Sequence, residues 1–168
     1  YDIAYMNPYH YAEFSKVPGY RAIAREQGKQ IRGIEVVREN DTATQLSDLE
    51  GETLAFPAPA AFAATILVRA ELERMGCADT PKYVSSHDSV DLSVARGFVK
   101  AGGGIERTFS SALESGLEGA RVLWRSPGYT PHAFAVHPDL SEGDKEKIAD
   151  LLVGLSETEE VQGLLGGV

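Results

Sequence analysis

Cysteine is almost absent from this chain, since Cys77 is the only one among 168 residues. A single thiol excludes an internal disulfide framework and any metal site built from several cysteines. Long apolar runs are missing from the sequence as well, because no stretch reaches the ~18 to 20 apolar residues of a membrane-spanning helix. The longest apolar-rich run, residues 54–68, contains two prolines.

Positive charge is scarce too. The chain has 16 lysines and arginines against 25 aspartates and glutamates, which gives a formal net charge of −9. This balance excludes non-specific nucleic-acid binding, which needs a basic face. It does not exclude a small bound anion, because backbone amides supply positive potential whatever the net charge. The hydrophobic fraction of 43% is that of an ordinary globular protein, and the length suits one domain or two small lobes.

The common catalytic signatures are missing from the sequence. There is no nucleophile elbow, phosphate-binding P-loop or HExxH pattern. The histidines His10, His87, His132 and His137 do not have metal-ligand spacing, so we expect neither a metal nor another cofactor. An enzyme that uses His87 with Asp88 as an acid/base pair is disfavoured, because adjacent helical residues diverge by about 100°.

Strand and helix patterns alternate through the middle of the chain, which predicts an α/β domain with a largely parallel sheet. We expect strands at residues 2–6, 20–25, 31–37, 53–56, 82–84, 98–101, 121–124 and 132–137. We expect helices at residues 8–14, 60–75, 86–95, 105–113, 140–155 and 157–165. A polar turn between the second and third strands predicts that these two form a hairpin.

Two segments have the layout of a ligand site, in which a strand ends and a helix begins with small or polar side chains. In residues 56–63 the free amides of the helix start are able to bind an anion, and the alternative is an ordinary helix start with apolar packing. His87 occupies the second such position, where the alternative is a capping or surface histidine. Asp88 and Asp91 follow it in the first turns, where the helix dipole favours acidic residues.

Two further features have two readings each. The run of three glycines, residues 102–104, predicts either a flexible strand-to-helix turn or a place where a ligand approaches the backbone. Tyr5, Tyr9 and Tyr11 cluster beside His10, either as core and surface aromatics or as a wall of a ligand cleft.

Several segments together resemble one protein family. They are YMNPYHY at residues 5–11, residues 46–69 with the core DLEGETLAFPAPA, SSHDSV at residues 85–90, and residues 126–140. These segments resemble the substrate-binding proteins of phosphate, phosphite and phosphonate ABC transporters, which have the type II periplasmic binding-protein fold. The resemblance covers about residues 1–155.

The resemblance implies a non-enzymatic, exported periplasmic protein that binds a phosphonate-like or other small anionic or polar ligand and partners with a membrane permease. The alternative is the input domain of a membrane receptor such as a histidine kinase. It also implies that residues ahead of Tyr1 complete one lobe. Without those residues the partial lobe would expose sheet edges, which a second copy of the chain could cover in a homodimer.

The domain organisation implied by the resemblance is one complete α/β lobe with a mostly parallel sheet, residues 38–128, and part of a second lobe. The second lobe would comprise residues 1–37 and residues 129–168 with the C-terminal helices. The expected hinge lies at residues 33–38 and 125–131, and the lobes would close over an oxyanion in the cleft. The implied ligand-binding residues are Tyr9, Tyr11, Ala60, Ala61, Phe62, Ala63, Ser86, His87, Glu106 and Thr108.

One departure from the family pattern concerns the first of these helix starts. Phosphonate-selective members carry a Ser-Thr-Ser type run there, whereas this chain has Ala61, Phe62 and Ala63. Each lost hydrogen bond to a charged group removes roughly 1.5 to 3 kcal/mol. We therefore expect weak binding of the usual phosphate and phosphonate ligands, and a ligand that is larger, less charged or more apolar.

Overall fold

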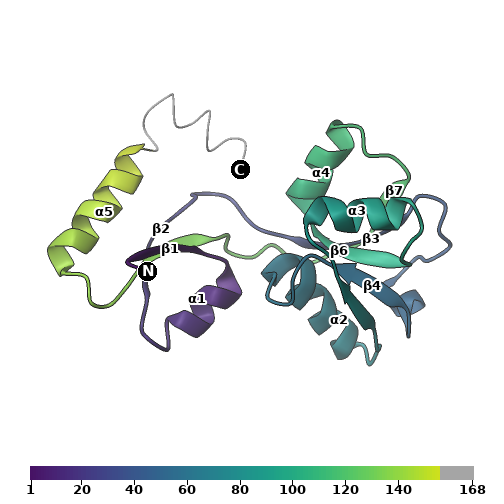
Figure 1. Ribbon diagram of the computed structural model, residues 1–168, viewed down its shortest axis with the longest axis horizontal. Helices are drawn as coiled ribbons and strands as arrows, with labels where there is room; N and C mark the ends of the chain where they lie inside the picture. The colour runs from purple at the N-terminus through teal and green to yellow at the C-terminus, as the bar shows by residue number, and fades with distance from the viewer. Residues whose placement is uncertain (156–168) are drawn as a thin grey trace. The chain divides into compact units, whose positions relative to one another are not determined.

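The computed structural model describes residues 1–155, which form parts of two compact units (Figure 1). Of the described residues, unit 1 contains residues 1–29 and 131–155, whereas unit 2 contains residues 30–130. The expected helix at residues 157–165 lies outside the described residues. Within residues 1–155, no helix is long and apolar enough to cross a membrane.

Unit 2 is built on a five-stranded sheet. In spatial order the strands are β5 (Thr80–Tyr83), β4 (Thr53–Phe56), β6 (Ala101–Ile105), β3 (Gly33–Arg38) and β7 (Ala120–Arg125). β4 pairs in parallel with β5 and β6, while β3 pairs antiparallel with β6 and β7. Four of the five strands therefore point the same way, which confirms the expected α/β class with a mostly parallel sheet.

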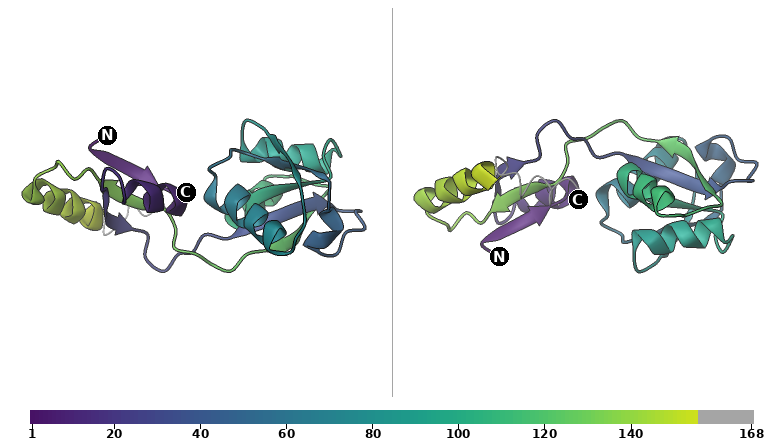
Figure 2. Two further views of the ribbon diagram at one scale, coloured as in Figure 1. Left: turned by 90° about the horizontal axis from the view of Figure 1, so that it is seen from below. Right: turned by 90° about the horizontal axis from the view of Figure 1, so that it is seen from above.

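Helices cover both faces of this sheet (Figures 1 and 2). One face carries a continuous helical segment, in which the π-helix η2 (Phe62–Leu67) leads into α2 (Val68–Arg74). The other face carries α3 (His87–Ala95) and α4 (Glu106–Glu114), and a short 3₁₀ helix, η1 (Leu46–Leu49), precedes β4. The core on the α2 face is centred on Val37, Leu54, Phe56, Val68 and Leu72. The core on the α3 face is centred on Ile34, Val36, Val90, Val94 and Phe109.

The three glycines form part of β6 rather than a turn. The expectation of a strand at residues 98–101 followed by a glycine turn is therefore wrong. The physical reason is the close approach of helices on both faces of the strand. A Cβ atom on Gly103 would overlap the carbonyl oxygen of Ala64 in η2, and one on Gly102 would overlap the Val90 side chain in α3.

Unit 1 has a three-stranded antiparallel sheet with β8 in the middle. Its elements are β1 (Ile3–Met6), α1 (Pro8–Phe14), β2 (Arg21–Arg25), β8 (Ala133–Val136) and α5 (Glu142–Leu155). Met6, Tyr20 and Ala135 form its buried centre. An ion pair of 3.0 Å between Arg21 and Glu142 links β2 to α5.

The second and third strands do not form the expected hairpin. β2 pairs with β8 in unit 1, whereas β3 pairs with β6 and β7 in unit 2. The chain crosses between the units at residues 29/30 and 130/131 rather than at the expected 37/38 and 128/129. β3 cannot belong to the expected first hinge, because Ile34, Val36 and Val37 are fully buried in the sheet of unit 2.

Candidate functional site

Three helix starts of unit 2 lie at one edge of its sheet. β5, β4 and β6 are parallel neighbours, and a helix follows the carboxyl end of each. η2 follows β4, α3 follows β5, and α4 follows β6. The amino ends of helices carry positive potential and free amides, so this edge is suited to negative charge.

The start of η2 offers backbone amides without a side-chain cap. The carbonyl of Ala61 accepts from the amides of Thr65 at 2.9 Å and Ile66 at 3.1 Å, so that the first helical bonds begin only at residue 65. The wide i to i+5 bond to Ile66 is typical of π-helical turns, which occur often at functional sites. The Thr65 hydroxyl donates to the carbonyl of Ala58 at 2.8 Å and fixes the preceding loop.

Apolar side chains surround these amides. Phe62 is half-buried, and its ring meets the ring of Tyr129 edge to face, with 5.5 Å between centroids. Ala63 is buried with its carbonyl against Gly33, while Ala60 and Ala61 are half-buried. The predicted residues 60–63 thus form one continuous turn, in which Phe62 and Tyr129 form an apolar wall.

His87 is the first residue of α3, after the N-cap Ser86. The Ser86 hydroxyl accepts from the amide of Ser89 at 3.1 Å, so this predicted ligand residue acts as a helix cap here. His87 is half-buried, and its buried Nδ1 has no hydrogen-bond partner among the described residues. Burial lowers the pKa of His87, although neighbouring Asp88 acts in the opposite direction, so the imidazole is neutral at neutral pH.

Asp91 lies one helical turn after His87 and is only 3% exposed. Its Oδ1 has no hydrogen-bond partner within residues 1–155. Burial raises the pKa of Asp91 to about 6, and the negative charge of Asp88 adds to this shift. The sequence indicates only that an acidic residue suits this helix start, and it carries no signal that the carboxyl group is buried.

Glu106 and Thr108 lie at the start of α4. The Glu106 carboxylate accepts from Nε of Arg125 at 2.7 Å and lies 3.8 Å from Nε of Arg32. Thr108 is half-buried on the same helix. The contacts with Arg125 and Arg32 fix the position of the Glu106 carboxylate within unit 2. A ligand contact of Glu106 or Thr108 stays a prediction.

Tyr9 and Tyr11 lie on α1 of unit 1. Tyr9 is exposed, whereas Tyr11 is half-buried against the unit 1 core and its hydroxyl accepts from the amide of Ala22 at 3.2 Å. Tyr5 stacks on His132, with 5.2 Å between ring centroids. Tyr11 therefore has a structural contact of its own, and the role of both tyrosines in ligand binding stays a prediction.

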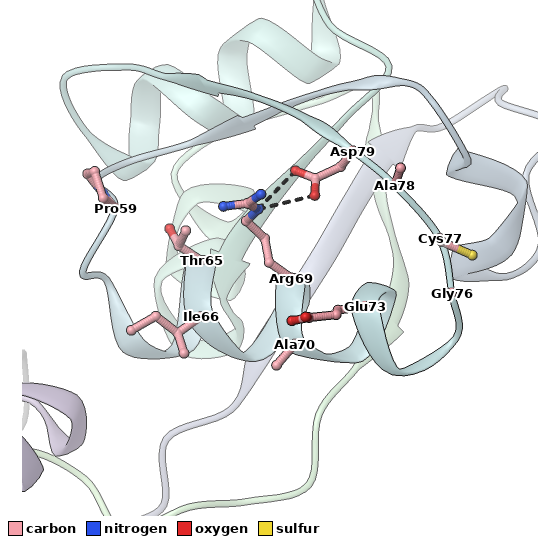
Figure 3. Close-up of a pocket in the computed structure, with 10 residues that line it drawn as sticks. All are labelled: Pro59, Thr65, Ile66, Arg69, Ala70, Glu73, Gly76, Cys77, Ala78 and Asp79. Carbon is pink, nitrogen blue, oxygen red and sulfur yellow. Dashed lines mark hydrogen bonds and ion pairs between the residues drawn. The ribbon is translucent and has the colours of Figure 1, made fainter.

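An open pocket of about 700 Å³ lies along α2 (Figure 3). Nε of Arg69 donates to both carboxylate oxygens of Asp79, at 3.1 and 3.0 Å. The other lining residues are Pro59, Thr65, Ile66, Ala70, Glu73, Gly76, Cys77 and Ala78. None of the predicted ligand residues lines this pocket, and the ion pair within it links α2 to the loop before β5. No group of three metal-ligating side chains is present in the part of the chain that the structure describes.

The chain is similar in sequence and in structure to binding proteins of ABC transporters. A family model described as "ABC transporter, phosphonate, periplasmic substrate-binding protein" matches residues 1–168. PhnD1 from Prochlorococcus marinus, solved in complex with methylphosphonate, is similar in structure with a TM-score of 0.85 and 16% sequence identity. That match covers 98% of this chain and 69% of PhnD1.

Two further solved structures are similar. A binding protein component of an ABC phosphonate transporter from Pseudomonas aeruginosa has a TM-score of 0.76 and 15% identity, over 98% of this chain and 60% of its own. The periplasmic aliphatic sulphonate binding protein SsuA from Escherichia coli has a TM-score of 0.71 and 20% identity, over 99% of this chain and 57% of its own. The present chain thus spans between 57% and 69% of the length of these three proteins.

Proposed function

Because the chain belongs to the family of periplasmic substrate-binding proteins of phosphonate ABC transporters, we propose that it binds a small oxyanion with an apolar substituent. The structural likenesses show the type II periplasmic binding-protein fold. The family is one of transporter substrate-binding proteins and not of enzymes. In the proposal the bound ligand is delivered to a membrane permease.

The observation that carries the proposal is the start of η2. η2 follows β4 at the sheet edge that suits an anion, its start has no side-chain cap, and the residues there are Ala61, Phe62 and Ala63 instead of hydroxyl donors. Backbone amides are able to hold the oxygens, while the Phe62 and Tyr129 rings supply an apolar contact for the rest of the ligand. Ser86, His87, Glu106 and Thr108 lie at the neighbouring helix starts and complete the proposed site in unit 2.

The preference for an apolar substituent is testable by calorimetry with phosphate, methylphosphonate and phenylphosphonate. We expect methylphosphonate to bind more tightly than phosphate and phenylphosphonate more tightly still. Each buried methylene-sized group adds about 0.8 kcal/mol, or roughly fourfold in affinity. Phe62→Ala is expected to remove the preference for phenylphosphonate over phosphate.

Phe98→Ala is the matched control, because Phe98 is 69% exposed and lies in the same unit. This variant is expected to retain the order of affinities. The proposed ligand class is wrong if phosphate binds as tightly as phenylphosphonate. The assigned role of Phe62 is wrong if Phe62→Ala leaves the order unchanged.

A further inference from the structure

Two buried polar atoms on α3 require a physical explanation. Nδ1 of His87 and Oδ1 of Asp91 are both buried without a hydrogen-bond partner in the described part of the chain. Buried polar groups in native proteins are nearly always paired, so an exception of this kind often marks a functional group. The occurrence of two such atoms on one helix therefore indicates a functional role for that part of α3.

The spacing places both side chains on one face of α3. His87 and Asp91 are four residues apart in a nine-residue helix, and side chains at this spacing are neighbours about 5–6 Å apart at Cβ. Because helical Cβ atoms tilt toward the amino end, the Asp91 carboxyl group is directed toward the start of α3. Oδ1 of Asp91 lies near Gly104 of β6, 4.0 Å from where a Cβ atom at that position would be.

We propose that Asp91 is a positioning residue that acts through His87 when an oxyanion binds at the start of α3. The imidazole takes up one proton from solvent, donates Nδ1–H to Oδ1 of Asp91 and donates Nε2–H to the bound anion. No bond to a heavy atom forms or breaks, and the proton is released when the anion leaves. This inference rests on the proposed oxyanion-binding function.

The electrostatics favour proton uptake only with the ligand in place. In the free protein, burial and the positive end of α3 both disfavour a charged imidazolium at His87. A bound anion supplies the opposite charge on one side of the ring, and the Asp91 carboxylate supplies it on the other. The two charge-assisted hydrogen bonds then compensate for the burial of the imidazolium.

The other charged groups near α3 are engaged elsewhere or lie farther along the helix. Asp88 is exposed on α3 itself and is the charge that acts on both His87 and Asp91. β4 and β6 have no charged residues. The charged residues on the remaining elements packed against α3 are Glu35 and Arg38 on β3, Glu106, Arg107 and Glu114 on α4, and Arg121 and Arg125 on β7.

Five of these groups have contacts or positions away from the pair. Arg125 binds Glu106, Arg121 donates to the carbonyls of Asp41 and Ala43, and Arg38 packs against Gly97 at the far end of α3. Glu35 is paired with Gly103, and the face of the sheet at Gly103 packs against η2 rather than α3. Asp88 is the exposed carboxylate that acts on both His87 and Asp91, so its replacement is the appropriate control for the replacement of Asp91.

The test is calorimetry with methylphosphonate between pH 6 and 8, in buffers of different ionisation enthalpy. Methylphosphonate loses its own second proton in this pH range, so proton uptake is compared between variants, in which the contribution of the ligand is the same. Asp91→Asn is expected to take up fewer protons than the unaltered protein and to bind at least about tenfold more weakly at pH 6.5, and this difference in affinity is expected to shrink as pH rises. Asp88→Asn removes the same charge from the adjacent exposed residue and is expected to retain the proton uptake.

A measurement on the unaltered protein covers the case in which Asp91→Asn does not fold. Nitrogen-15 NMR of His87 at pH 7 is expected to show one protonated ring nitrogen in the free protein and two with saturating methylphosphonate. Unchanged proton uptake in Asp91→Asn, or a neutral His87 in the complex, overturns the inference and leaves the proposed function intact. If phosphate, methylphosphonate and phenylphosphonate all fail to bind, the proposed function and the inference are both wrong.

Discussion

Replacement of Gly103 by alanine is expected to lower the free energy of unfolding of unit 2 by about 3 kcal/mol, the upper end for an overpacked core. The added Cβ atom would overlap the carbonyl oxygen of Ala64, and the Phe56 ring also lies too close to it. A backbone carbonyl is not able to rotate away as the end of a side chain does. The π-helix η2 would therefore have to move off the sheet.

Urea unfolding followed by Trp124 fluorescence is the appropriate measurement, because the single tryptophan lies in β7 of unit 2. Gly104→Ala is the matched control in the same strand. Its added Cβ atom would meet Cγ1 of Ile34 at 3.3 Å, a side-chain atom that is able to shift. Equal losses of stability in the two variants would show that η2 does not limit the space at Gly103.

Replacement of Glu35 by methionine is expected to raise the free energy of unfolding at pH 8 by about 1 to 3 kcal/mol, the cost of a buried polar group without a partner. Glu35 is fully buried in β3, and neither carboxyl oxygen has a hydrogen-bond partner among residues 1–155. Methionine has a similar length and an adaptable shape, so it fills the site without a carboxyl group. Urea unfolding as a function of pH measures the change.

The pH dependence of this effect has a definite sign. Burial raises the pKa of Glu35 well above its ordinary value of 4.5, and nearby Asp79 adds to the shift. Above pH 4.5 the folded protein therefore holds a proton that the unfolded chain loses, so the free energy of unfolding falls as pH rises. The advantage of Glu35→Met should grow with pH from about that value up to the folded pKa.

Glu39→Met is the control, since Glu39 is exposed just after β3. It is expected to change stability little at any pH. Asp91 contributes a dependence of the same sign between its ordinary pKa of 3.8 and about 6, and this contribution is present in both variants and cancels from the comparison. A Glu35→Met protein that is less stable than its parent at pH 8 would show that the carboxyl group has a favourable contact.

Local patterns were sufficient to predict most elements, whereas pairing and burial were not readable from the sequence. Pro8 after Asn7 marks the start of α1, and Ser86 marks the start of α3, because helix caps depend on adjacent residues. The local sequence does not predict the glycine strand β6, because the glycines are required by the close approach of η2 and α3 to the two faces of the strand. Both helices are distant from β6 in the sequence. The false hairpin has the same origin, since β2 finds its partner β8 only after the whole of unit 2.

The candidate site shows the same division. The helix start at residues 60–63 and the position of His87 follow from strand-to-helix transitions that the sequence displays. Asp91 and Glu35 resemble ordinary polar residues of an exposed helix and an alternating strand. Their burial depends on tertiary packing, so their chemistry becomes visible only in the folded structure.

The point where the chain enters and leaves unit 2 has a consequence for the order of folding. Ile31 and Tyr129 exchange two backbone hydrogen bonds of 2.9 Å each, which joins the two ends of unit 2 one residue from its limits. Unit 2 therefore has all its strands in one stretch of chain, whereas β1 and β2 of unit 1 must wait for β8. Once unit 2 has folded, its joined ends replace a long flexible loop by a short one and reduce the entropy lost when β8 pairs. We therefore expect unit 2 to fold first and to hold the segments before and after it close together. Unit 1 is then expected to assemble last.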